Sequence, residues 1–178
     1  TGNYNSQTAK LYTDLGLFTC RTEVTSEVIQ IFNYLTGLSL NKNYQKFLVS
    51  PINMRERFIS LIRHEVKNKQ QGKPAGIIAK MNSLEDHEIC EELYKASQQN
   101  VPIDLIVRGF CILRPAVMDL SENIRVISII GRFLEHSRIF YFRNGEKHPE
   151  NGLFFMGSAD WMYRNLNNRV ETIVPIEN

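Results

Sequence analysis

The sequence predicts an α/β fold in which a mixed β-sheet is flanked by helices. Helix-like and strand-like runs alternate between residues 51 and 109, and the strand-like runs are rich in Val, Ile and Leu, which is typical of strands covered by helices. Four more strand-like runs follow between residues 124 and 176, and the middle two are joined by a short polar loop. A chain of 178 residues with 43% hydrophobic side chains is also sufficient for a packed core.

The first 48 residues predict the tail end of a preceding domain. Apolar side chains recur at intervals of three and four over residues 24–35, which indicates a helix, and Gly37 follows as a stop signal. The stretch LSLNKNYQKF, residues 38–47, is polar and irregular, as is typical of a linker. We therefore expect the C-terminal part of one domain plus a linker over residues 1–48, and a second domain over residues 49–178.

The second domain is predicted to begin in the order helix, strand, helix, strand. Pro51 opens the first helix and Gly72 closes it. A strand over residues 75–81, a helix over 83–100 and a strand over 102–109 follow. Ser83 and Asp86 have the spacing of a capping box at the start of the second helix. The first helix carries a basic stripe that we expect to be a solvated face: Arg55, Arg57, Arg63 and Lys67.

The rest of the second domain is predicted to add strands to the sheet. The expected strands are residues 124–130, 138–144, 152–160 and 169–176. Because the polar loop of residues 145–151 is too short to hold a crossover helix, the strands that it joins should be antiparallel. The predicted sheet is therefore mixed.

Charge and cysteine content exclude several classes of protein. The formal net charge is only +2, which is too small for a surface that binds nucleic acid or membrane as a whole, so an anionic ligand must bind at a local cluster. Cys20, Cys90 and Cys111 are widely spaced, which indicates neither a disulfide framework nor a zinc site and favours the cytoplasm. No apolar run approaches the ~20 residues that span a bilayer. Because the chain begins at Thr1 rather than Met, we expect it to be cut from a longer protein.

His136, in the run FLEHSR, is the leading catalytic candidate. Arg138 follows two residues later, on what should be the next strand, so the two side chains should point the same way. A histidine beside a cation can hold a phosphate, and imidazole can attack phosphorus or protonate a leaving oxygen. A histidine that only satisfies a loop hydrogen bond is the alternative, and on this pair alone it is favoured.

The run GSADW gives His136 its context. Gly157 and Ser158 end an apolar strand and Asp160 follows, so backbone and hydroxyl could approach a phosphate closely. His-x-Arg followed by Gly-Ser-x-Asp resembles the phospholipase D superfamily pattern of His-x-Lys and Gly-Ser-x-Asn. The chain departs from that pattern at Arg138, at Asp160 and at Arg143, which stands where the superfamily has aspartate, and this argues against a simple phosphodiesterase.

Four further residues are candidate phosphate or nucleotide contacts. Arg108 should emerge at the carboxyl end of a central strand, where open α/β sheets bind ligands, although it could equally reach into solvent. Lys80 lies inside a strand, needs an anionic partner there, and is a candidate phosphate contact. Tyr12 and Asp14 lie two apart before an apolar run that predicts a strand, so both could face one cleft. A core tyrosine and a capping aspartate are the alternative for this pair.

Long motifs over nearly the whole chain resemble the C-terminal region of bacterial polyphosphate kinases. They are TGNYNSQTAKLYTDLGLFT, FNYLTG, IIAKMNSLED, LIVRGFCILRP, IRVISIIGRFLEHSRIFYF and GSADWMYRNLNNRVE. The resemblance implies two C-terminal domains of phospholipase D-like fold and reversible transfer of the terminal phosphate of ATP to polyphosphate, with magnesium. By position, Tyr12, Arg108 and His136 match nucleotide-phosphate contacts; Asp14 lies in the same motif without an assigned role. TGNYN and GSADW would be the small-residue loops of the two domains.

The resemblance also implies what lies outside this chain. The histidine that becomes phosphorylated belongs to a His-x-Lys motif upstream of TGNYN. The N-terminal domains, and the arginines that hold magnesium and phosphate, lie upstream too, so we expect this piece to be inactive alone and assign no metal ligand within it. His136 is expected to act as general acid towards the leaving oxygen or to clamp the phosphoryl group, and Arg108 to neutralise growing charge. ATP or ADP and polyphosphate are the expected partners, without nucleic acid.

Further expectations concern the full-length protein. It should be a homo-oligomer in the cytoplasm, with peripheral association at the inner membrane as an option. A phospholipase D-type phosphodiesterase or nuclease, and a polyanion-binding module without chemistry, stay open as alternatives.

Overall fold

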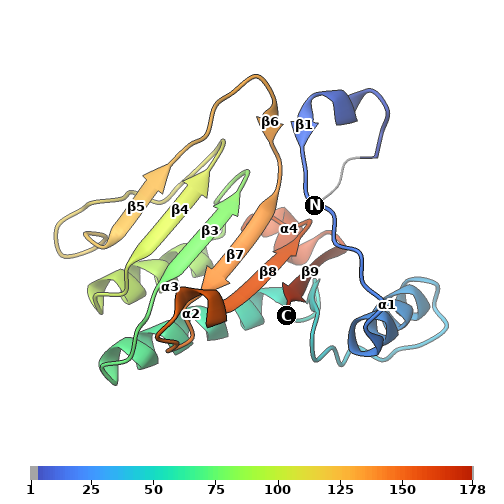
Figure 1. Cartoon of the computed structure of the whole chain (residues 1–178), viewed down its shortest axis with the longest axis horizontal. Coiled ribbons are helices and arrows are strands. Elements are labelled where there is room, and N and C mark those ends of the chain that lie inside the picture. Colours follow the sequence, from blue (N-terminus) through green and yellow to red (C-terminus); the bar gives the residue numbers. More distant parts are fainter. Residues whose placement is uncertain (1–3, 178) are drawn as a thin grey trace.

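A seven-stranded mixed sheet organises the chain (Figure 1). The computed structural model describes residues 4–177. The strand order is β2-β9-β8-β7-β3-β4-β5. β3, β4 and β5 run parallel to one another, whereas β3–β7 and the pairs from β7 to β2 are antiparallel. The predicted α/β fold with a mixed sheet flanked by helices is thus confirmed.

The sequence predicted most of the elements, with boundaries that differ by a few residues. The helices are α1 (Thr22–Leu35), α2 (Met54–Gln70), α3 (His87–Gln98) and α4 (Tyr163–Asn167). The strands of the main sheet are β2 (Leu48–Ser50), β3 (Ile77–Met81), β4 (Ile103–Val107), β5 (Ile124–Ile127), β7 (Arg138–Phe142), β8 (Leu153–Gly157) and β9 (Glu171–Ile176). Two-residue strands β1 (Tyr12–Thr13) and β6 (Leu134–Glu135) form a separate pair, and two short 3-10 helices span Thr8–Lys10 and Pro149–Asn151.

Four predictions about the elements need correction. The apolar run after Asp14 forms no strand: residues 15–21 connect β1 to α1 as an irregular segment, and Leu15, Leu17 and Phe18 are exposed. The elements β1, β2, β6 and α4 were missed, since all four are too short to show a period. Asp86 rather than Ser83 caps α3, accepting a hydrogen bond from the Ile89 N–H at 3.1 Å. The expected strand at 124–130 ends at Ile127.

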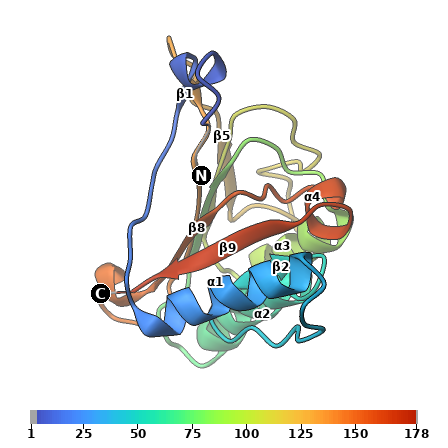
Figure 2. The ribbon, with the colours of Figure 1, turned by 90° about the vertical axis from the view of Figure 1, so that its right-hand side faces the viewer.

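The main core lies between the sheet and the pair α2 and α3, which share one side of it (Figure 2). Phe58 of α2, Phe140 of β7 and Trp161 form an aromatic cluster with centroid distances of 4.7–5.3 Å. All three are fully buried. The basic stripe of α2 is not simply solvated, because Arg55 binds Asp86 through Nη2 at 2.5 Å with only 18% of its side chain exposed. The helix is therefore tied to α3 by charge as well as by apolar packing.

The other face of the sheet is covered at one end only. Val24 and Ile31 of α1 pack there with Val49 of β2 and Val174 of β9. Towards β3, β4 and β5 the same face exposes apolar side chains, of which Ile78 is 43% and Ile127 44% accessible. Lys80 is the charged residue of β3 on this face, because side chains alternate along the strand.

Candidate active site

A two-residue parallel strand pair brings the start of the chain to His136. In this pairing Tyr12 lies opposite Leu134 and Thr13 opposite Glu135. The backbone N–H groups of Leu134 and His136 donate to the carbonyls of Leu11 (2.8 Å) and Thr13 (3.1 Å). Figure 1 shows β1 and β6 side by side, beyond the end of the main sheet. Asp14, 122 residues from His136 along the chain, is thereby placed beside it.

The His136 ring is held at both of its nitrogens. Nδ1 lies 2.8 Å from Oδ1 of Asp14, and Nε2 lies 2.9 Å from Nη1 of Arg138. Because a carboxylate only accepts and a guanidinium only donates, this network assigns the proton to Nδ1 and leaves a lone pair at Nε2. The His136 side chain is 19% exposed and that of Asp14 18%, so water competes little with either bond. The ring is therefore fixed in one tautomer and one orientation.

Arg138 is held in turn by Asp160. Its Nε and Nη2 donate to the two carboxylate oxygens of Asp160 at 3.0 and 3.3 Å, and its Nη1 also donates to the His136 carbonyl at 2.9 Å. Asp160 accepts a further bond from the backbone N–H of Asn82 at 2.8 Å. Both charged side chains are about nine-tenths buried, where a two-point pair is much more rigid than at the surface. The prediction that His136 and Arg138 point the same way is confirmed.

Tyr12 and Arg108 stand beside the same histidine. The Tyr12 ring lies 4.8 Å from the His136 ring and 5.8 Å from the guanidinium carbon of Arg108, which sits over it. Arg108 follows β4 at its carboxyl end and donates from Nη1 to the Glu135 carbonyl at 3.0 Å. β4 is next to the edge strand β5 rather than central. Tyr12 and Asp14 do face one place, as predicted, with His136 between them.

Lys80 has an anionic partner, as its position in a strand requires. Its Nζ lies 3.3 Å from Oε2 of Glu135 and donates to the carbonyl (3.0 Å) and the hydroxyl (2.7 Å) of Ser137. These contacts join Lys80 to the residues on both sides of His136, to the side chain of Glu135 and to the backbone and side chain of Ser137. Sequence reasoning missed Glu135, Ser137 and Asn82. Their signal is that each is a polar residue at or next to a strand terminus: Asn82 follows β3, Ser137 precedes β7 and Glu135 ends β6.

Gly157 and Ser158, the small residues of GSADW, contribute to the packing and pairing of β8 against β9. A Cβ on Gly157 would lie 2.1 Å from the Thr172 carbonyl, so the close approach of β9 requires glycine there. The Ser158 N–H donates to the same carbonyl at 3.0 Å, and its hydroxyl accepts from the Thr172 N–H at 3.2 Å. Arg143 binds carbonyls of its own loop, those of Glu146 and Lys147, and so closes a turn. The TGNYN loop lies partly outside the described residues.

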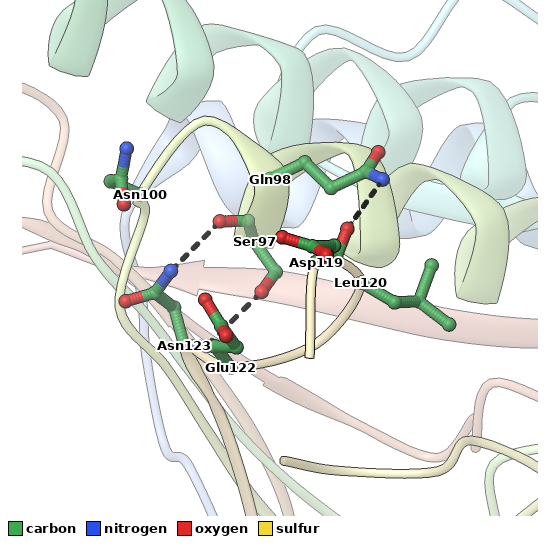
Figure 3. Close-up of a pocket in the computed structure, with 7 residues that line it drawn as sticks. All are labelled: Ser97, Gln98, Asn100, Asp119, Leu120, Glu122 and Asn123. Atoms are coloured by element: carbon green, nitrogen blue, oxygen red, sulfur yellow. Dashed lines mark hydrogen bonds between the residues drawn. The ribbon is translucent and has the colours of Figure 1, made fainter. Parts of the chain in front are cut away.

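A polar cavity of about 200 Å³ lies at the opposite end of the strands (Figure 3). In it Asn123 donates to the Ser97 carbonyl and Gln98 donates to the Asp119 carbonyl, both at 2.9 Å. Because Asn100 precedes β4 and Asn123 precedes β5, the cavity lies at the amino ends of these strands. In open α/β sheets ligands bind at carboxyl ends, where Arg108 stands. The bonds in this cavity fasten a loop to α3.

Neither a group of metal-binding side chains nor a membrane-spanning helix is found among the described residues. Within residues 4–177, His, Cys, Asp and Glu form no group of three or more that could hold a metal ion. The helices of this part of the chain also lack the combination of length and apolar character that crossing a membrane requires.

Family models divide the chain into two matched segments. Residues 1–41 match "Polyphosphate kinase C-terminal domain 1" and residues 47–178 match "Polyphosphate kinase C-terminal domain 2". Tyr12 and Asp14 therefore belong to the first segment, and Arg108, His136 and Arg138 to the second. The candidate site is formed where the two segments meet.

Similar proteins carry the same name. A polyphosphate kinase of Synechocystis is 59% identical over 99% of this chain, which covers 24% of that protein, and one of Bacillus anthracis is 48% identical with the same coverage. The crystal structure of polyphosphate kinase from Porphyromonas gingivalis superposes with a TM-score of 0.93 at 42% identity, covering all of this chain and 27% of the other. The chain thus spans about a quarter of the length of these relatives. On the strength of both family models and these identities, the chain belongs to the polyphosphate kinase family.

Proposed function

We propose that this chain forms part of the active site of an enzyme that reversibly transfers the terminal phosphate of ATP to polyphosphate. The observation that carries the proposal is the hydrogen-bonded series Asp14, His136, Arg138 and Asp160. It joins the two matched segments at the carboxyl end of the parallel strands, with the cation of Arg108 beside it. A fixed imidazole with one guanidinium at Nε2 and a second guanidinium over the neighbouring Tyr12 ring suits an anionic phosphoryl group.

His136 would act through Nε2. Arg138 holds this lone pair in the present arrangement, so a phosphoryl oxygen that takes over one N–H of Arg138 would meet the guanidinium and the imidazole together. His136 then clamps the phosphoryl group or, once protonated at Nε2, gives its proton to the leaving oxygen, with Asp14 stabilising the imidazolium. Arg108 would neutralise charge that grows on the transferred group. The nucleophile in this proposal is a histidine elsewhere in the longer protein.

Magnesium finds no suitable donor set among the residues of this site. Its oxygen ligands are usually carboxylates and substrate phosphates, whereas the carboxylates of Asp14, Glu135 and Asp160 already bind His136, Lys80 and Arg138. No step is therefore assigned to a metal on these residues. We also propose that the longer protein is a homo-oligomer in the cytoplasm, with peripheral association at the inner membrane as an option.

The test is His136→Ala in the full-length protein. It should lower ATP-dependent polyphosphate synthesis by at least about 100-fold, because positioned proton transfer and phosphoryl clamping are both lost. The matched control is His148→Ala, since that side chain is 73% exposed on the loop after β7 and should leave synthesis unchanged.

Three results would contradict the proposal. Near-normal synthesis by His136→Ala, with folding intact by circular dichroism, would remove His136 from the site. Hydrolysis of DNA or of a phosphodiester by the wild-type protein, without polyphosphate synthesis, would favour the phosphodiesterase alternative. Binding of polyphosphate without any turnover in the full-length protein would favour a polyanion-binding module.

A further inference from the structure

Lys80 is a charged residue set among apolar neighbours. On the open face of the sheet its cross-strand neighbours are Ile106 of β4 and Ile139 of β7. These residues line a mostly apolar hollow of about 340 Å³ together with Ile78 and Phe154. Only 15% of the Lys80 side chain is exposed. An ammonium group in such surroundings is costly unless its protons are bound, so its partners should show what it does.

The Lys80 ammonium is held by two hydrogen bonds and one ion pair within the protein. It donates to the Ser137 hydroxyl at 2.7 Å and to the Ser137 carbonyl at 3.0 Å, and it lies 3.3 Å from the Glu135 carboxylate. Two of its three N–H donors are therefore taken by Ser137 and its charge is already paired with Glu135, so it is poorly placed to bind a phosphate oxygen as well. Its partners are the residues immediately before and after His136.

The backbone around His136 needs such support. The pair β1–β6 has only two residues on each strand, and the loop before it is exposed, with Ile130 91% accessible. So short a ladder cannot fix a backbone by itself. Lys80 reaches this segment from β3, a strand inside the main sheet, whereas Arg108 reaches it through one bond to the Glu135 carbonyl.

We infer that Lys80 is a positioning residue, which holds Glu135 and Ser137, the residues on either side of His136, from the rigid sheet and is not itself a phosphate ligand. The inference rests on the proposed function, because it concerns how His136 is aimed at the phosphoryl group. A loss of this support moves the His136 ring relative to Asp14 and Arg138 without removing any of the three. Misplacement of a catalytic group by about 1 Å is enough to lower turnover strongly.

The experiment compares Lys80→Met with Lys73→Met in the full-length protein. Methionine suits the apolar face, and Glu135, with 32% of its side chain exposed, can turn to water, so the variant should fold. We expect kcat for polyphosphate synthesis to fall about 10- to 100-fold while KM for ATP and for polyphosphate stays within about twofold. Lys73 is exposed before β3, and its replacement should change neither constant.

Lys80→Arg separates positioning from phosphate binding. A planar guanidinium cannot direct its N–H groups at Ser137 and Glu135 as the ammonium does, so arginine should rescue little, whereas it would serve well as a phosphate ligand. Ser137→Ala should lower kcat less than Lys80→Met, and the double variant should be no worse than Lys80→Met, because both changes break the same contact. A raised KM with unchanged kcat, or full rescue by arginine, would overturn the inference.

A measurement without substrate keeps this inference separate from the proposed function. The rate at which diethyl pyrocarbonate modifies His136, measured by peptide mass spectrometry against His148 as an internal standard, should rise in Lys80→Met and not in Lys73→Met. Unchanged modification of His136 in Lys80→Met would overturn the positioning role even if the enzyme is active. If the wild-type protein makes no polyphosphate, the proposed function fails while a raised modification rate still supports the positioning of His136.

Discussion

Two buried carboxylates, Glu65 and Asp160, lie at opposite ends of β3 and bind very different partners. Glu65 is fully buried and accepts hydrogen bonds from the backbone N–H groups of Gly76, before β3, and of Asn144, after β7, at 2.8 and 2.6 Å. Asp160 accepts one backbone bond, from Asn82 after β3, and two from the guanidinium of Arg138. At one end the carboxylate joins backbone to backbone, and at the other it joins backbone to a side chain that touches His136.

This difference separates stability from function. Both hydrogen bonds of Glu65 come from backbone groups that do not contact the candidate active site. Their loss should therefore loosen the local structure around Gly76 and Asn144 without changing the geometry of that site. The bonds of Asp160 continue through Arg138 to Nε2 of His136, so their loss should affect both the fold and the chemistry. A carboxylate bound only to backbone groups is therefore expected to be structural, and one bound to a cation beside a polar ring is expected to be functional.

The largest effect is expected for Asp160→Asn. The buried Arg138 loses its counter-charge, which should lower the free energy of unfolding by about 3 kcal/mol. In the full-length protein polyphosphate synthesis should fall about 100-fold, because Arg138 no longer holds Nε2 of His136. Urea unfolding of the 178-residue chain and kcat of the full-length protein measure the two effects.

The control for this change is Asp104→Asn. Asp104 also pairs with an arginine, Arg125, at 2.6 Å, but their side chains are 42% and 70% exposed and lie on the open face of the sheet. Neither stability nor synthesis should change appreciably. If Asp160→Asn lowered stability and left synthesis intact, Asp160 would be a structural residue like Glu65 and the comparison would fail.

A smaller effect, on stability alone, is expected for Glu65→Ala. Two backbone N–H groups lose their acceptor, which should cost about 2 kcal/mol, while kcat should stay within about twofold. Burial raises the pKa of Glu65 above its ordinary value of 4.5. The folded state therefore holds this proton more tightly than the unfolded chain, so the stability that Glu65 contributes is greatest below pH 4.5 and declines as pH rises through the raised pKa.

Unfolding of both proteins by urea between pH 4 and pH 7 would show this trend. The free-energy difference between wild type and Glu65→Ala should narrow as pH rises. A loss of polyphosphate synthesis in Glu65→Ala, at a temperature where it is folded, would contradict the separation of the two ends.

Local sequence patterns predicted most helices and strands and the placement of Arg138 and Arg108. They did not predict the contacts of the site that depend on strand pairing between distant parts of the chain. Alternation along a strand placed Arg138 on the side of His136, and the end of an apolar run placed Arg108 at the carboxyl end of β4. The bond between Asp14 and His136 could not be foreseen from spacing, because it depends on a two-residue strand pair with no period of its own. The partners of Lys80 were equally hidden, since they follow from the register of β3 against β7.

The smallest effect on stability is expected at Glu92, a carboxylate whose partners, Arg63 and Lys95, have solvent-exposed side chains. The hydrogen bond from Arg63 lowers the pKa of Glu92 from 4.5 to about 2, although burial opposes this, and Lys95 adds a second bond at 2.8 Å. A lowered pKa means that the stabilisation is complete above pH 4.5 and is lost as pH falls through about 2. Because 61% of the Arg63 side chain is exposed, Arg63→Met should lower the urea midpoint only slightly at pH 7, less still in 1 M salt, and progressively less as pH falls through about 2. A loss of stability as large as that of Glu65→Ala, or one insensitive to salt, would contradict this prediction. It would show that burial of one partner is enough to make a surface ion pair strong. The difference between Glu65 and Asp160 at the two ends of β3 would then be one of degree.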